Sequence, residues 1–166
     1  MDSHIEKTED RNFTAADIGP LENLNRHTFK HPILRKAVPG KLFLKDLLGL
    51  TGMEVSMNRF AAGARMPVAH RHRKNEELYI FIRGRGQFQI DGRVIEVCEG
   101  TVLRVAPDGA RAWRNHSEED LYYICIQVTA GSGLAPEIAD AENIRKLVRW
   151  PTSSPLSNEE FGGQET

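Results

Sequence analysis

The sequence predicts a single all-β domain, and three observations lead to that prediction. Short apolar runs, each only a few residues long, recur between about residues 41 and 128. Turns that contain glycine separate these runs, and Asp91-Gly92, which stands between two of them, is a strong β-hairpin signal. Residues 53–128 show no long stretch of helical periodicity. This combination is typical of a β-sandwich or a β-barrel.

The apolar runs can be assigned in order as extended segments. The first is Lys41–Leu48, which is closed by a glycine-containing turn, and the second is Met53–Phe60, in which apolar and polar residues alternate. The remaining runs cover residues 78–82, 87–90, 93–97, 101–105, 111–114 and 121–128. The last of them is apolar on both faces, and a strand of that kind must be covered on both sides.

The chain is expected to have three parts. Residues 1–40 form an N-terminal arm, residues 41–130 form the barrel domain, and residues 131–166 form a C-terminal helix and tail. In the arm, Thr14–Asp17 resembles a capping box and predicts the start of a short helix. In the last part, the apolar spacing within residues 139–148 predicts one short helix.

Composition restricts the partners and the location of the protein. The formal net charge is −1, and the basic residues are scattered, so nucleic acid is not expected as a partner. The N-terminus lacks the apolar core of a secretory signal, and no run approaches the roughly 20 apolar residues that span a membrane. We therefore expect a cytoplasmic protein. There, Cys98 and Cys125 are expected to be buried thiols, with a disulfide or a thiolate ligand as the alternative.

Two histidines and one acid form a candidate metal site. His70 and His72 are two residues apart, so in a strand they project from the same face. If the next strand runs antiparallel beside them, Glu77 near its start can reach the same point. Two imidazoles and a carboxylate suit a divalent cation and leave coordination positions open. The alternative is a surface strand that carries a His-x-His pair by chance.

The spacing around these residues resembles the first motif of the cupin family, G-x5-H-x-H-x3,4-E-x6-G. His70, His72, Glu77 and Gly84 match it, although the opening glycine stands one residue too far upstream. Glu76 also satisfies the three-residue gap, but only Glu77 has the right distance to Gly84. The resemblance therefore implies that His70, His72 and Glu77 are metal ligands.

The second cupin motif, G-x5-P-x-G-x2-H-x3-N, is matched less completely. Gly100, Pro107 and Gly109 fit it with one extra residue before the proline. The family's fourth ligand, a histidine, falls at Ala112, and its asparagine falls at His116. Three outcomes are open: a metal held by three protein ligands and water, recruitment of His116 as a fourth ligand, or a retained fold without metal.

The resemblance also implies side-chain directions around the site. If Glu77 faces the interior, Tyr79 and Phe81 face it too, as core or pocket wall. Ala112, in the position of the family's ligand, is expected to face inward with Arg114, and Trp113 is expected to pack outside. The possible substrate-pocket residues are Tyr79, Phe81, Arg114 and His116.

The resemblance implies a double-stranded β-helix, or jelly-roll, barrel and a homodimer formed through an apolar sheet face. It also implies a divalent metal ion (Fe, Mn, Ni or Zn), weakly bound or absent here because of Ala112. Two functions are expected. One is a metal-dependent oxygenase, isomerase or lyase that acts on a small molecule. The other is a non-catalytic cupin that binds a small ligand without a functional metal.

Overall fold

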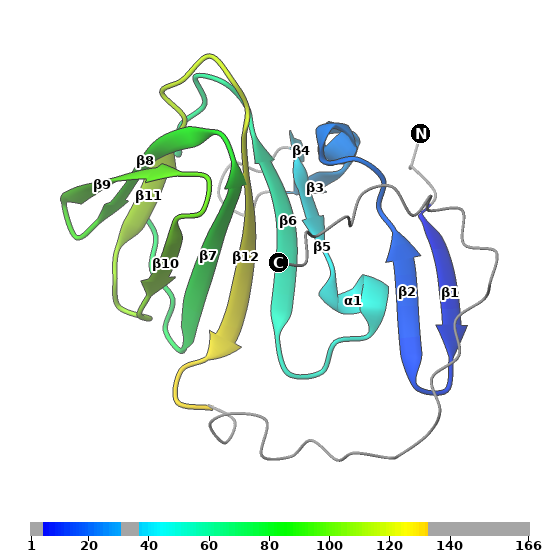
Figure 1. Ribbon diagram of the computed structural model, residues 1–166. Helices are drawn as coiled ribbons and strands as arrows, with labels where there is room; N and C mark the ends of the chain where they lie inside the picture. The colour runs from blue at the N-terminus through cyan, green and yellow to red at the C-terminus, as the bar shows by residue number, and fades with distance from the viewer. Residues whose placement is uncertain (1–4, 31–36, 133–166) are drawn as a thin grey trace, which may run out of the picture. The chain divides into compact units, whose positions relative to one another are not determined.

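The computed structural model describes residues 5–30 and 37–132, and within these ranges the chain is mostly β-structure (Figure 1). The strands are β1 (Glu6–Asp10), β2 (Phe13–Asp17), β3 (Thr28–Lys30), β4 (Ala37–Pro39), β5 (Lys41–Phe43), β6 (Glu54–Phe60), β7 (Asn75–Arg83), β8 (Arg85–Ile90), β9 (Arg93–Cys98), β10 (Val102–Val105), β11 (Arg111–Arg114) and β12 (Leu121–Thr129). The helical segments are the 3-10 helix η1 (Leu21–Arg26) and the helix α1 (Lys45–Leu48). The all-β prediction is confirmed.

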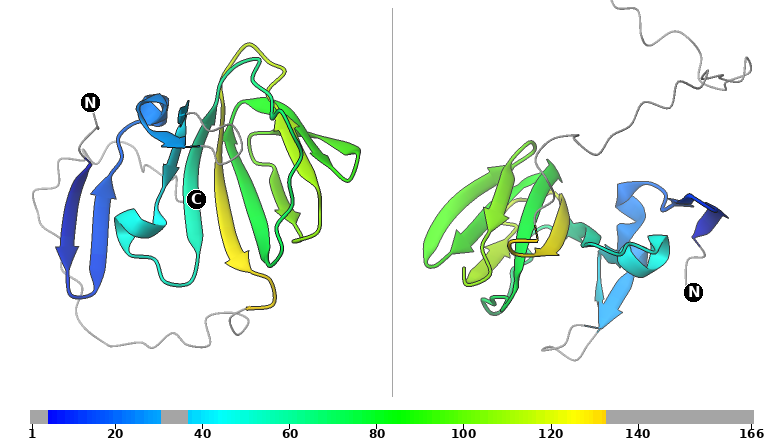
Figure 2. Two further views of the ribbon diagram at one scale, coloured as in Figure 1. Left: turned by 180° about the vertical axis from the view of Figure 1, so that it is seen from behind. Right: turned by 90° about the horizontal axis from the view of Figure 1, so that it is seen from below.

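Two antiparallel sheets form the barrel. The larger has the strand order β10-β7-β12-β6-β5, and the smaller has the order β11-β8-β9. The smaller sheet lies beside the β10-β7-β12 part of the larger one, as two opposite views show (Figures 1 and 2). Strands β8 and β9 are joined by Asp91 and Gly92, whose φ angles of 49° and 83° are those of a type I′ turn. The predicted hairpin is therefore confirmed.

The core between the two sheets is rich in aromatic side chains. Tyr79 and Phe81 of β7 face it and are 1% and 2% exposed. The Tyr79 ring lies 4.8 Å from that of Phe88 in β8, which joins the two sheets by an edge-to-face contact. The buried core consists of Tyr79, Phe81, Phe88, Val97, Val105, Leu121, Tyr123 and Cys125. Tyr79 and Phe81 thus point inward, as the sequence predicted.

The N-terminal segment is extended where a helix was expected. Thr14–Asp17 belongs to β2, which pairs with β1 across its whole length, and the prediction of a helix start is wrong. A four-residue pattern cannot offset the cost of helix nucleation. A hairpin satisfies the backbone groups of both segments at once.

The first apolar run also divides differently from the prediction. Lys41–Phe43 pairs with β6 as β5, but Lys45–Leu48 forms the single-turn helix α1. The helix ends at Gly49, whose φ of 69° is left-handed and whose N–H donates to the carbonyl of Lys45. The glycine that the sequence placed after a strand is therefore a helix C-cap.

Several predictions concern the surface and the termini. Both cysteines are free, but Cys98 is exposed, so the expectation of two buried thiols holds only for Cys125.

On the outer sheet face, Leu78 and Val102 are 37% and 65% exposed, and their coverage by a second subunit stays a prediction. The predicted helix within residues 139–148 lies outside the described residues. In the part that the structure describes, no helix has the length and apolar character of a transmembrane helix.

Candidate metal centre and ligand pocket

The segment between β6 and β7 carries the two histidines and is fixed to β11 and its preceding turn. His70 forms two backbone hydrogen bonds with Arg111. The N–H of His70 donates to the carbonyl of Arg111 at 3.0 Å, and the N–H of Arg111 donates to the carbonyl of His70 at 2.8 Å. The N–H of His72 donates to the carbonyl of Pro107 at 3.0 Å. Glu77 lies near the start of β7 and is 2% exposed. Backbone pairing, rather than a continuous strand, therefore sets the positions of the imidazoles.

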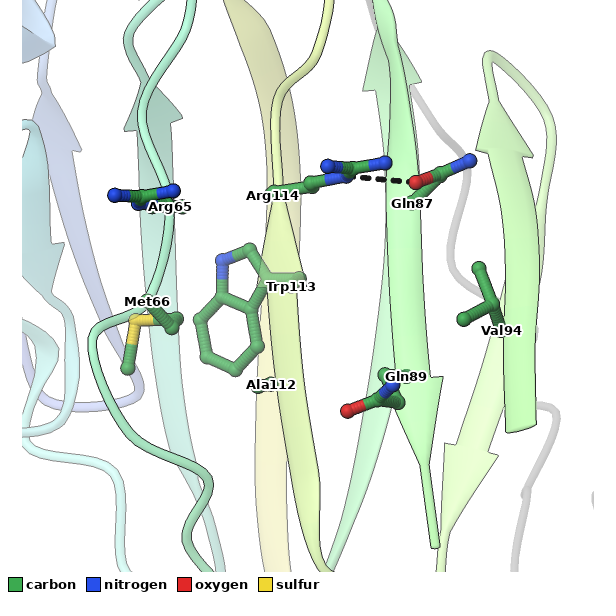
Figure 3. Close-up of a pocket in the computed structure, with 8 residues that line it drawn as sticks. All are labelled: Arg65, Met66, Gln87, Gln89, Val94, Ala112, Trp113 and Arg114. Carbon is green, nitrogen blue, oxygen red and sulfur yellow. Dashed lines mark hydrogen bonds between the residues drawn. The ribbon is translucent and has the colours of Figure 1, made fainter. Parts of the chain in front are cut away.

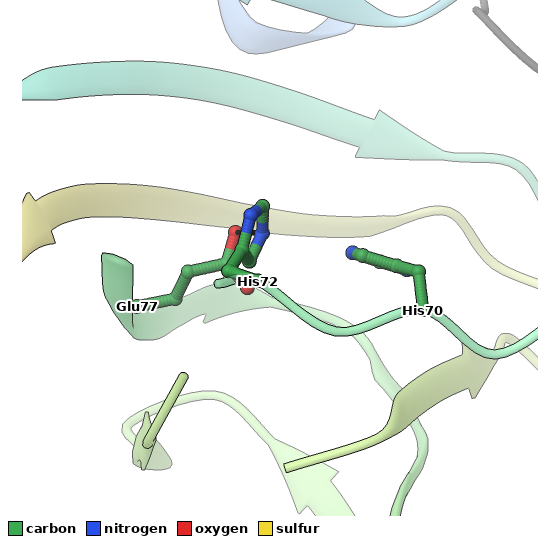
Figure 4. A group of neighbouring side chains, drawn as sticks. All are labelled: His70, His72 and Glu77. Atoms are coloured by element: carbon green, nitrogen blue, oxygen red, sulfur yellow. Dashed lines mark hydrogen bonds and ion pairs between the residues drawn. The ribbon is translucent and has the colours of Figure 1, made fainter. Parts of the chain in front are cut away.

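The three side chains meet at one point. One potential ligand atom from each of His70, His72 and Glu77 lies within 4.8 Å of the other two. Figure 4 shows the ring of His70 directed toward His72, with the carboxylate of Glu77 beside His72. The neighbouring Glu76 instead pairs with Arg104 at 2.5 Å on the surface. The structure thus brings together the two histidines and the acid that the sequence singled out.

The Glu77 carboxylate is held from several sides. Its Oε2 accepts hydrogen bonds from the Tyr79 hydroxyl at 2.5 Å and from Arg111 Nε at 3.1 Å. Its Oε1 accepts one from Gln127 Nε2 at 2.7 Å. Burial alone would raise the pKa of this group, but the Tyr79 hydrogen bond and the positive charge of Arg111 lower it below its ordinary value. Glu77 is therefore an oriented carboxylate that is ionised at neutral pH.

His70 is held in the form that binds metals. Burial lowers its pKa, although the negative charge of Glu77 acts in the opposite direction. A lowered pKa favours the neutral imidazole, which has a free lone pair for a cation.

The spacing of the donor atoms also suits a metal ion. His72 Nε2 lies 3.1 Å from Glu77 Oε1. Two donors at adjacent positions around one ion, with bonds of about 2.1 Å, would be about 3 Å apart. The three residues therefore fit a divalent metal ion.

In β11, which carries part of the second motif, the residues that point into the interior are not those expected from the sequence. Trp113 pairs with Phe88, and the two rings stack 5.3 Å apart in the core. Arg111, two residues before Trp113, is completely buried. Ala112 and Arg114 consequently point outward, so the inward assignment of Ala112 and the outward assignment of Trp113 are wrong. Pairing with β8 decides this parity, and counting residues from the turn could not.

Arg111 occupies the interior beside the carboxylate. Besides Glu77, its side chain reaches the carbonyl of Gly109 from Nη1 at 2.9 Å. It therefore holds the turn at residues 107–109 against β7, and the same turn accepts the N–H of His72. The Arg111 guanidinium beside Glu77 lowers the electrostatic attraction of the site for a cation.

Two predicted pocket residues lie elsewhere. Arg114 donates to Gln87 at 2.7 Å in a separate outer cavity of about 320 Å³ (Figure 3). His116 Nε2 lies 3.9 Å from Glu96, beyond the end of β11. Neither belongs to the group formed by His70, His72 and Glu77, so His116 is not positioned as a fourth ligand. Tyr79 supports Glu77 from the core, and Phe81 is a core residue.

A cavity of about 420 Å³ opens directly on the candidate metal centre. Its volume is within the range of about 300–1,000 Å³ that is usual for small-molecule sites. Most of the exposed area of its wall is apolar, although polar and charged side chains also reach it. It includes Phe29, Val38, Pro39, Phe60, Met66, Pro67, Val68, Trp113 and Tyr123 together with Lys41, Asn58, Arg59, Arg65, His70, His72, Glu77 and Gln127.

Sequence reasoning missed three polar residues on this wall: Lys41 on β5, Asn58 on β6 and Gln127 on β12. Asn58 stands opposite Lys41 in the register of β5 and β6 and is only 3% exposed. The polar members of the alternating run Met53–Phe60 therefore face inward. The alternation of polar and apolar residues in this run could have indicated a polar pocket wall. The sequence around Lys41 and Gln127 contains no pattern that would place them there.

Comparisons with known proteins agree with this geometry. The family model described as Cupin domain matches residues 57–127. No protein with curated function matches the chain. A crystal structure of a cupin protein from Bacteroides fragilis is 43% identical, with a TM-score of 0.59, and the match covers 62% of this chain and 87% of that one.

Two more distant structures share the fold. One is a Cupin 2 conserved barrel domain protein from Salinispora arenicola, with 20% identity, a TM-score of 0.54, and coverage of 70% of this chain and 91% of that one. The other is a protein from Photorhabdus luminescens, with 19% identity, a TM-score of 0.50, and coverage of 54% and 74%. At these identities the similarity concerns the double-stranded β-helix alone. From the family match and the Bacteroides relative together, the chain belongs to the cupin family.

Proposed function

We propose that this cupin binds one divalent metal ion through His70, His72 and Glu77 and acts on a small molecule that enters the adjoining cavity. One observation carries the proposal: the three candidate ligands converge at the wall of a cavity whose size suits a small molecule. Three protein ligands leave coordination positions open for water or substrate. A bound metal would supply Lewis-acid or oxygen chemistry at those positions.

The protein's own residues would prepare the site. Tyr79 and Arg111 hold one oxygen of Glu77, so the other oxygen keeps a fixed direction toward the histidines. The apolar side chains of Phe60 and Trp113 on the cavity wall would limit water around a bound substrate. A large part of the substrate is therefore expected to be apolar.

The composition of the wall favours an oxygenase over an isomerase or lyase. Glu77 is the only acidic residue on the described cavity wall, and His70 and His72 are its only imidazoles. If all three hold a metal, no carboxylate or imidazole remains there as a general base. Proton transfer in an isomerase or lyase needs such a group. Lys41, Arg59 and Arg65, the other basic side chains on the described wall, cannot accept a proton while they are charged.

A specific observation supports a second candidate, a ligand-binding cupin without a functional metal. Arg111 already forms an ion pair with Glu77, and Ala112, which the motif aligns with the family's histidine, points away from the site. In that case the carboxylate would serve to hold the guanidinium. The cavity would still bind a small molecule.

Metal analysis separates the two candidates. The full chain is purified without a metal-affinity tag or added metal, and its Fe, Mn, Ni and Zn contents are measured. The metal-dependent function predicts near-stoichiometric metal in the wild type and in a His116→Ala control, and its loss in His72→Ala. A metal-free wild type whose melting temperature is unchanged by any of these ions would contradict that function and support the metal-free binder.

A further inference from the structure

Lys41 lines the cavity and carries an ammonium group that has no acidic partner among the described residues. Its Nζ lies 4.7 Å from the ring centroid of Phe43 and 5.6 Å from that of Phe29. Among the described residues, no carboxylate forms an ion pair with it. Aromatic faces attract a cation but accept its hydrogen bonds poorly. The N–H donors of Lys41 are therefore open to a ligand.

The charges on the described cavity wall do not balance. Arg59 is neutralised by Asp120 at 2.7 Å, and Glu77, the only acid on the wall, is neutralised by Arg111 at 3.1 Å. Lys41 and Arg65 are the other two cations on the wall, and neither forms an ion pair with any of the described residues. The cavity thus offers net positive charge inside an apolar enclosure.

Because Lys41 is partly removed from water, its unpaired charge is energetically costly. Removal from water lowers the pKa of Lys41, while the negative charges of Glu77 and Glu54 only partly oppose the effect. Holding the ammonium charged in the empty cavity is therefore unfavourable. An anionic group placed against Nζ would relieve that cost and would form a charge-assisted hydrogen bond.

We propose that the cavity recognises a small organic acid, whose carboxylate is bound by Lys41 and whose apolar body packs on Phe60 and Trp113. The inference rests on the proposed function, because it assigns a substrate class to the same cavity. It does not depend on the metal, since Lys41 is outside the group formed by His70, His72 and Glu77. A neutral analogue of the same shape lacks the partner that Lys41 requires and binds more weakly.

The test compares acids with their primary amides on chelator-treated full-length protein, so that no metal contributes. The probes are butanoate, benzoate, phenylacetate and 3-phenylpropanoate, each paired with its own amide. Binding is followed by saturation-transfer NMR and calorimetry. At least one acid is expected to bind tenfold or more tightly than its amide. Lys41→Met, which keeps an unbranched side chain, should abolish that preference and leave amide binding unchanged.

Lys45→Met, at an exposed position of α1, is the matched control and should retain the preference. If amides bind as tightly as acids, or if Lys41→Met keeps the preference, the acid-binding inference is overturned while the small-molecule cavity stands. If none of the eight probes binds at millimolar concentration, the inference falls together with the small-molecule function. The metal content, measured separately, tests the metal centre in either case.

Discussion

Arg111 and Glu77 form an ion pair inside the barrel, with Nε of the arginine 3.1 Å from Oε2 of the carboxylate and side-chain exposures of 0% and 2%. The pair joins β11 of the smaller sheet to β7 of the larger one. It fixes the candidate ligand Glu77 and the turn at residues 107–109 at the same time. Arg111 therefore couples the stability of the barrel to the geometry of the site.

Removing one member of this pair should be costly. Arg111→Met leaves the Glu77 charge buried without its guanidinium partner, and we expect it to lower the free energy of unfolding by about 3–5 kcal/mol. Arg104→Met, which breaks the exposed pair with Glu76, is the control and should cost no more than about 1 kcal/mol. Urea denaturation measures both. Equal effects of the two substitutions would show that the buried pair has no special role.

Stability should depend on pH through Glu77. Its pKa in the folded protein is lowered from the ordinary value of 4.5, so its ionised form stabilises the fold above that value. This stabilisation is lost as the pH falls through the lowered folded-state pKa. Between about pH 6 and pH 3, the wild type should therefore lose more stability than Glu77→Gln. Urea denaturation of metal-free protein measures the difference, and Glu99→Gln, at an exposed site, should behave as wild type. A steeper loss in Glu77→Gln would contradict this assignment.

The two cysteines should react differently. Burial raises the pKa of Cys125 to about 12, and its Sγ lies 3.7 Å from Glu77 Oε1, whereas Cys98 is exposed. The thiolate is the reactive form of cysteine. Iodoacetamide at about pH 8 should therefore modify Cys98 in the native protein, and Cys125 only after unfolding. Mass spectrometry of the digested protein identifies the modified residue, and Cys98→Ser should leave the native protein unmodified. Native labelling of Cys125 would mean that the core beside the site is open.

The glycine that closes the first motif should be required for packing. Gly84 has a φ of 89°, and a Cβ there would lie 2.4 Å from the carbonyl oxygen of Asp120. Gly100 has a similar φ of 82°, but a Cβ there would meet no atom within 4 Å, so it isolates the backbone effect. Gly100→Ala should cost about 1–2 kcal/mol. Gly84→Ala should cost about 1–3 kcal/mol more because of overpacking. Thermal unfolding compares the two, and equal losses would contradict the packing role.

Local patterns predicted much of the fold and part of the site. Asp91-Gly92 specified a hairpin because both residues tolerate positive φ, and the spacing of His70, His72 and Glu77 matched a family motif. The direction of Trp113 was not predictable in this way, because it depends on pairing with Phe88 in another strand. One residue of register reverses every side chain in a strand.

The remaining site residues depend on contacts between distant segments. Lys41 and Gln127 are separated by most of the barrel sequence, yet both line the same cavity. Arg111 reaches Glu77 only because β8 sets the direction of β11. The N-terminal hairpin shows the converse case: pairing of β1 with β2 overrides a local helix-start signal at Thr14–Asp17.

Titration of the metal-free full-length protein with Mn²⁺ and Zn²⁺ by isothermal calorimetry tests the metal centre most directly. The wild type and the His116→Ala control should bind one ion per chain, and His70→Ala and His72→Ala should each weaken binding at least tenfold. Absence of binding by the wild type, or binding by His72→Ala with unchanged affinity, would contradict the assignment of His70, His72 and Glu77 as ligands.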